Sequence, residues 1–148
     1  MSPEGATFEE RQSSETIEEV LVVSFRVVTP EQLDWEPYDR FPGRHRAALT
    51  EIAALRHTRA NFIRHEPGER GPRHIERAQD ETFVPVRGTL TMYLGEPPAR
   101  HDIPVGGLVH VEAGTAQQMV NETDEEVFVF VYGAPAERAG ADVIESAV

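Results

Sequence analysis

The chain is 148 residues long, which is about the length of one domain and enough to bury a sizeable hydrophobic core. Its formal net charge of −12 argues against nucleic-acid binding, because a phosphate backbone would be repelled rather than neutralised. There is no cysteine, so disulfides and thiolate metal sites are excluded.

Residues 1–19 open the chain as a polar, acidic stretch with little apolar periodicity, and we expect a mobile arm there. The first twenty residues are too acidic for a signal peptide. No apolar run approaches the roughly 18 residues that a membrane span needs. These features predict a cytoplasmic protein that does not associate with a membrane.

The first predicted strand covers residues 20–28, a run rich in β-branched side chains. Residues 33–38 are predicted to form a loop in which Trp35 covers the wall of the fold, and residues 41–43 are predicted to form a turn. Residues 44–55 are ambiguous, because their alanines and leucines favour a helix without excluding strands.

Regularly spaced turn signals follow and divide the remaining chain into short apolar segments. Predicted strands lie at residues 60–65, 82–87, 89–94, 100–105, 108–112, 117–120 and 127–132. Short strands at intervals of about 8–12 residues indicate an all-β sandwich or barrel. Pro85 cannot donate to a strand ladder, so a bulge or an unpaired position is expected there. After residue 133 we expect a tail that frays or wraps a neighbour.

Apolar side chains on these strands are expected to fill the core. The large members of this predicted core are Phe62, Phe83, Met92, Met119, Phe128 and Phe130.

The most informative stretch is residues 72–88, where one imidazole and two carboxylates stand on two adjacent strand-like segments. Side chains two apart on a strand share a face, so His74 and Glu76 point the same way. Glu81 follows a short polar link and shares its face with Phe83. The spacing predicts that these three polar side chains converge on one site.

The stretch resembles the first motif of the cupin superfamily, which reads roughly Gly, five residues, His-x-His, three or four residues, Glu, six residues, Gly. His74 fills the first histidine place and Glu76 occupies the second. Glu81 fills the glutamate place, and Gly88 closes the motif after six residues.

The second motif of the family reads roughly Gly, five residues, Pro-x-Gly, two residues, His, three residues, Asn. It aligns with Gly106, Glu112, Gly114, Gln117 and Asn121. Glu112 replaces the proline and Gln117 replaces the histidine, so the spacing is complete while two identities differ. The resemblance covers about residues 60–133.

The resemblance implies an all-β, jelly-roll cupin barrel that forms a single domain with an N-terminal arm. For residues 44–55, the position ahead of the first motif favours a strand pair, against the helical preference of the composition. The expected organisation is an arm at 1–19, a barrel at 20–136 with motifs at 68–88 and 106–121, and a tail at 137–148.

The resemblance also makes four side chains candidate ligands of one divalent metal ion: His74, Glu76, Glu81 and Gln117. His74 and Glu81 match the ligands of the family, whereas Glu76 and Gln117 stand in place of histidines. One imidazole, two carboxylates and an amide oxygen form a harder set than three histidines, which favours Mn²⁺ or Fe²⁺, with Ni²⁺ or Zn²⁺ as further candidates, over copper. Open coordination positions would take oxygen, water or a chelating substrate.

A metal-free site is the alternative. Two carboxylates enclosed together cannot both ionise cheaply, so one of them would be protonated and would serve as general acid or base beside His74. Glu76 could also pair with a neighbouring arginine instead of a metal: Arg73, Arg77 or Arg87.

Four further residues are candidates for ligand binding: Phe83, Asn121, His65 and His110. His65 and His110 lie on predicted strands, where a one-residue slip of register decides which face they occupy. Asn121 either binds a polar ligand or supports its own turn.

Two functions of different classes follow for a single-domain cupin with a small-molecule pocket. One is a divalent-metal-dependent enzyme of dioxygenase or isomerase type that acts on a small polar substrate. The other is a metal-free module that binds or senses a small ligand without catalysis. Residues 20–28 would be an apolar edge strand, which invites pairing, so we expect a homodimer with residues 20–30 at its interface.

Overall fold

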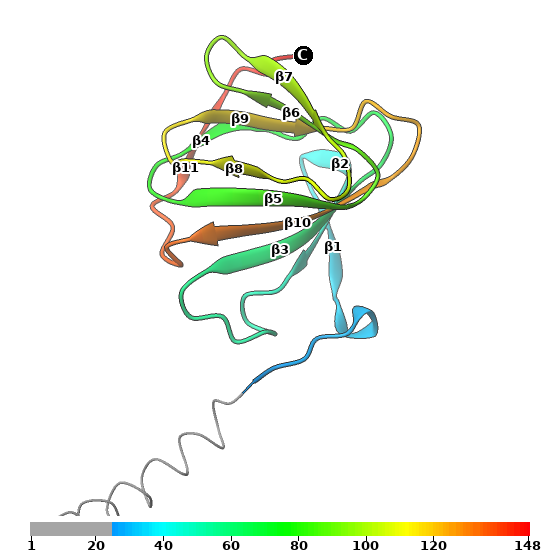
Figure 1. The fold of residues 1–148 in the computed structure, drawn as a ribbon, viewed down its shortest axis with the longest axis vertical. Helices are drawn as coiled ribbons and strands as arrows, with labels where there is room; N and C mark the ends of the chain where they lie inside the picture. Colours follow the sequence, from blue (N-terminus) through cyan, green and yellow to red (C-terminus); the bar gives the residue numbers. More distant parts are fainter. Residues whose placement is uncertain (1–24) are drawn as a thin grey trace, which may run out of the picture.

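Two antiparallel β-sheets make up most of the protein (Figure 1). The computed structural model describes residues 25–148. After a short 3-10 turn, Pro30–Gln32, the strands are β1 (Trp35–Tyr38), β2 (Phe41–Ala48), β3 (Arg59–His65), β4 (Arg73–Glu76), β5 (Asp80–Arg87), β6 (Leu90–Leu94), β7 (Ala99–Ile103), β8 (Val109–Val111), β9 (Ala116–Val120), β10 (Val127–Ala134) and β11 (Ala141–Ile144). Within these described residues, no helix has the length and apolar character to cross a membrane.

The strand order in the six-stranded sheet is β1-β2-β3-β10-β5-β8, and that in the five-stranded sheet is β11-β4-β9-β6-β7. The core lies between the sheets, because its buried side chains come from both of them: Ile63, Phe83, Leu90, Met92, Ile103, Val111, Met119, Val127, Val129 and Val131. This two-sheet arrangement is the all-β jelly roll that the sequence predicted. The burial of Phe83, Met92 and Met119 confirms their predicted place in the core.

The alternation along β10 determines which apolar side chains enter the core. Its valines are buried, with Val129 fully so, whereas Phe128 and Phe130 are only half-buried on the opposite face. There they stack with Phe62 from β3, at ring-centroid distances of 5.0 and 5.5 Å. The prediction that these three phenylalanines fill the core is therefore wrong.

The seven strands predicted between residues 60 and 132 are all confirmed, with ends that differ by at most two residues. The irregularity expected at Pro85 is also present. Pro85 pairs with Val129 whereas Arg87 pairs with Phe128, so Val86 is the extra residue of a bulge.

Two predictions for the segment ahead of these strands are wrong. Residues 35–38 form β1 rather than a loop, and residues 41–43 begin β2 rather than form a turn. Pro37 is tolerated because β1 is an edge strand, where a missing N–H need not break a ladder bond. Trp35 does cover the wall as expected, with its ring 5.6 Å from that of Phe128. The ambiguous segment continues β2 to Ala48 and then turns.

The predictions for the two ends of the chain have different outcomes. The acidic arm at 1–19 lies outside the described residues, as do residues 20–24 of the first predicted strand, and residues 25–28 belong to no strand. The expected tail contains β11, which pairs with β4 so that Val143 lies opposite His74. Residues 141–144 are therefore paired within a sheet rather than frayed, and they border the strand that carries His74 and Glu76.

Candidate functional site

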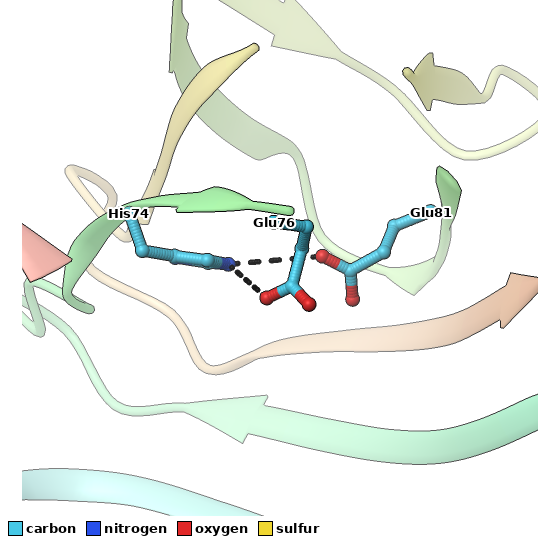
Figure 2. Close-up of side chains that lie close together, drawn as sticks. All are labelled: His74, Glu76 and Glu81. Atoms are coloured by element: carbon cyan, nitrogen blue, oxygen red, sulfur yellow. Dashed lines mark ion pairs between the residues drawn. The ribbon is translucent and has the colours of Figure 1, made fainter. Parts of the chain in front are cut away.

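The side chains of His74 and Glu76 from β4 and Glu81 from β5 converge on one point (Figure 2). The imidazole Nε2 of His74 lies 3.3 Å from Oε2 of Glu76 and 3.7 Å from Oε1 of Glu81. One potential ligand atom from each residue lies within 4.8 Å of the other two. Three donors of these types at this separation are able to hold one metal ion.

Glu76 is almost completely buried and is already paired with a cation. Arg138, from the segment between β10 and β11, donates from Nε to Oε1 of Glu76 at 2.6 Å and from Nη2 to Oε2. The hydrogen bond to Glu76 is the main reason that the pKa of Arg138 is raised. The ion-pair partner of Glu76 is therefore Arg138, and not Arg73, Arg77 or Arg87 as the sequence suggested.

Both ring nitrogens of His74 face oxygen atoms. Nδ1 lies 3.2 Å from the carbonyl oxygen of Pro72, while Nε2 faces the two carboxylates. If Nδ1 donates its proton to that carbonyl, the neutral imidazole has a lone pair on Nε2 directed at negative oxygens. That arrangement is repulsive, and a metal ion placed between Nε2 and the carboxylates would relieve the repulsion.

Gln117, on β9, lies opposite His74 in the strand ladder. Its Nε2 donates to Oε1 of Glu81 at 3.0 Å, which leaves its own Oε1 buried without a hydrogen-bond partner among the described residues. A buried acceptor of this kind costs free energy unless something fills it. An imidazole, two carboxylates and an unpartnered amide oxygen therefore fit a hard or borderline divalent cation.

A cavity of about 220 Å³ opens beside the triad, with walls from both sheets. Four predicted site residues line it: His74, Glu81, Phe83 and Gln117. Glu76 does not line the cavity, but it contacts two residues that do, His74 and Arg138. The volume is below the roughly 300–1,000 Å³ of sites for drug-sized ligands, so the cavity suits a smaller molecule.

Several cavity residues were missed by reasoning from the sequence. The missed polar residues are Tyr38, Arg44, Arg46, Arg59, Asn61, Gln79, Tyr132 and Arg138. A signal for four of them was available, because Arg44 and Arg46 share one face of β2 while Arg59 and Asn61 share one face of β3. Polar side chains at alternate positions on the inward face of a sheet indicate a pocket rather than an apolar core.

The other predicted ligand-binding residues lie away from this cavity. His110 is exposed on β8, where its Nδ1 is 2.8 Å from the hydroxyl of Thr82. Asn121 is buried and holds its own turn, since its Nδ2 donates to the carbonyls of His65 and Glu125 and its Oδ1 accepts from Thr123. His65 is buried on β3, and neither ring nitrogen has a hydrogen-bond partner among the described residues.

We expect His65 to make the protein less stable as the pH falls below about 6.5, the ordinary imidazole value. Burial, and secondarily the charge of Arg44, lowers the pKa of His65 well below that value in the folded state. The unfolded chain then binds the proton more readily than the folded protein does. The contribution of neutral His65 to stability is therefore complete above the pKa that His65 has in the unfolded chain, and it is lost as the pH falls. The free energy of unfolding should therefore decrease between pH 7 and pH 5.

Urea unfolding across this pH range measures the effect. His65→Phe should flatten the pH dependence, whereas the exposed control His101→Phe should retain it. Equal slopes for the two variants would contradict the assignment.

Together the two sheets form a jelly-roll β-sandwich with a polar cavity between them. Residues 61–132 match the family model described as the cupin domain. The chain therefore belongs to the cupin superfamily. A search of curated proteins finds no sequence match.

Solved structures share the fold at low identity. A sugar phosphate isomerase of the cupin superfamily from Silicibacter pomeroyi has 23% identity and a TM-score of 0.66, with 74% of this chain and 76% of that chain covered. The polyketide cyclase RemF from Streptomyces resistomycificus has 14% identity and a TM-score of 0.71, with 82% and 86% covered. KdgF from a Halomonas species has 15% identity and a TM-score of 0.61, with 74% and 93% covered. These similarities establish the fold.

Proposed function

We propose that this cupin is a divalent-metal-dependent enzyme of isomerase or dioxygenase type that acts on a small polar molecule. The observation that carries the proposal is the triad, whose three donor atoms lie within 4.8 Å of one another beside the cavity. The names of the similar structures, an isomerase and a cyclase, support small-molecule chemistry in this fold.

Each residue has a distinct task in the proposed site. His74, Glu81 and Gln117 would hold the ion with Glu76, and a bound ion would polarise an oxygen atom of the substrate. Arg138 holds the buried carboxylate of Glu76 in place. Glu81 is the one carboxylate of the triad that lines the cavity, so it would hold the ion at the cavity wall.

One observation favours a second candidate, a metal-free binding module. Both carboxylate oxygens of Glu76 already accept hydrogen bonds from Arg138, so the buried charge is neutralised without a metal. A protonated His74 would then bridge Glu76 and Glu81, and the cavity would bind its ligand through hydrogen bonds and charge alone.

Elemental analysis distinguishes the two candidates. Protein purified without an affinity tag should contain roughly one equivalent of Mn, Fe, Ni or Zn if the enzyme proposal is right. A preparation that contains none, and takes up none on incubation with each ion, would favour the binding module.

We also propose that the protein is cytoplasmic and forms a homodimer to which residues 20–30 contribute. Phe25 and Val27 support the interface, because both are large apolar side chains that are mostly exposed. Light scattering should give about twice the chain mass of 16.5 kDa, and Phe25→Ser with Val27→Ser should lower it. A parent protein that is monomeric at micromolar concentration would contradict the proposal.

A further inference from the structure

The cavity has the opposite charge to the chain that forms it. Four arginines line it, Arg44, Arg46, Arg59 and Arg138, while Glu81 is the one carboxylate in its lining. The formal charge of these side chains is 4 − 1 = +3, whereas the whole chain carries −12. Cations gathered in a concave site on an acidic protein favour anionic ligands.

Some of this charge is already compensated by the protein. Arg138 is paired with Glu76, and Arg46 lies 4.0 Å from a carboxylate oxygen of Glu36. Arg44 and Arg59 have no ion-pair partner within residues 25–148. Two positive charges therefore remain on β2 and β3 against the single carboxylate of Glu81 in the lining.

Arg44 is the less expected of these two residues. It is only 8% exposed, and its Nε is buried without a hydrogen-bond partner among the described residues. The carboxylates of Glu69 and Glu81 attract its charge from a distance, but neither forms an ion pair with it within residues 25–148, and a buried charge without a direct anionic partner is costly. The ring of Tyr38, 4.5 Å from the guanidinium carbon, offsets part of the cost but supplies no hydrogen-bond acceptor.

The head of Arg44 is also closely confined. A Cβ atom at Gly71 would lie 2.7 Å from Nη1 of Arg44, so the guanidinium packs directly against the backbone there. Burial lowers the pKa of Arg44, yet an arginine side chain stays protonated in proteins. The protein thus holds the charged guanidinium of Arg44, which has no ion-pair partner within residues 25–148, in a fixed position at the cavity wall.

We propose that the cavity binds a small molecule bearing a carboxylate or phosphate group, and that Arg44 is the main receptor for that group. A planar guanidinium matches an oxyanion with paired hydrogen bonds, which makes arginine suited to this task. Arg59, which is more exposed, adds attraction at the rim. The end of the ligand away from its anionic group would reach His74 and Glu81 and react there. This part of the inference rests on the proposed function.

The test is thermal unfolding of the full-length protein with sodium malonate or sodium phosphate, at an ionic strength held constant with sodium chloride. Both anions, or one of them, should raise the melting temperature of the parent saturably, because a ligand that binds only the folded state stabilises it. Arg44→Met should weaken that binding at least tenfold, and Arg59→Gln should weaken it less. The exposed control Arg56→Met should respond as the parent does.

The stability of Arg44→Met without anion separates recognition from a structural role. If Arg44 serves ligand binding, Arg44→Met without anion should be at least as stable as the parent, since the substitution removes an unpaired buried charge. If Arg44 is merely structural, Arg44→Met should be less stable and keep its anion response, and that result would overturn the proposal. A stronger response to malonate identifies a carboxylate ligand, and a stronger response to phosphate identifies a phosphate ester.

The absence of a saturable response to either anion in the parent would also overturn the proposal. Calorimetry with Mn²⁺ on the same protein reports the metal site independently. If the protein responds to an anion but does not bind Mn²⁺, only the enzyme proposal is refuted. If it binds Mn²⁺ but does not respond to either anion, only the anion site is refuted.

Discussion

Replacement of His74 by alanine or Glu81 by glutamine should weaken divalent-cation binding by more than about 100-fold in titration calorimetry with Mn²⁺, Fe²⁺, Ni²⁺ and Zn²⁺. The first change removes the imidazole, and the second removes a full negative charge. Loss of an outer partner of a metal ligand already costs about 10–100-fold, so loss of a direct ligand should cost more.

The two remaining candidates should show smaller effects. Glu76→Gln should have an intermediate effect, because Arg138 already compensates part of the charge of Glu76. Gln117→Ala should have the smallest effect, since a neutral amide oxygen is the weakest donor of the four. Glu112→Gln and His101→Ala alter exposed residues of matching type and should bind as the parent does. A parent protein that binds none of the four ions, or binding that is indifferent to His74 and Glu81, would refute the metal site.

Arg138→Ala should destabilise the metal-free protein by about 2 kcal/mol in urea unfolding. The change leaves the carboxylate of Glu76, whose side chain is 1% exposed, buried without its cation. Breaking a buried pair costs about 3–5 kcal/mol, and we expect less here because 43% of the Arg138 side chain is exposed and water would fill part of the gap. A divalent cation should restore stability and bind more tightly than to the parent, because a competing positive charge is gone.

A matched control lies in the same part of the chain. Arg77 pairs with Asp142, and both side chains are more than half exposed, so Arg77→Ala should cost far less stability than Arg138→Ala. The double variant Arg138→Ala with Glu76→Gln should recover most of the stability, since no buried charge then lacks a partner. A cost for Arg138→Ala that persists in this double variant would show that Arg138 acts through other contacts.

The local pattern of the sequence was sufficient to predict most of the strands. Turn residues separate the apolar segments, and the i, i+2 rule placed His74 and Glu76 on one face of β4. The same rule left the face of β10 undetermined, because residues 127–132 alternate valine with aromatic residues and both faces are apolar. Packing against the second sheet, which is a long-range property, decides that the valines enter the core.

The missed parts of the site depend on contacts between residues far apart in the chain. Arg138 meets Glu76 across 62 positions, and the segment around Arg138 is small and polar with no strand signal. Arg44 lies in a segment whose composition favours a helix, so its inward direction follows only from pairing with β3. Spacing within a motif predicts neighbours on one strand or on consecutive strands, but it does not predict which distant strand closes the pocket.

The position of β11 has a consequence for local opening of the protein. β11 has four residues and pairs only with β4, so it is the outermost strand of its sheet. Short, half-exposed edge strands open at a lower free energy than central strands, and their amide protons exchange with solvent earlier. Arg138 lies three residues before β11, so a transient opening that extends to it would release the cation held on Glu76. The charge balance of the site is therefore linked to one of the least protected parts of the fold, while β9, which carries Gln117, stays paired on both sides.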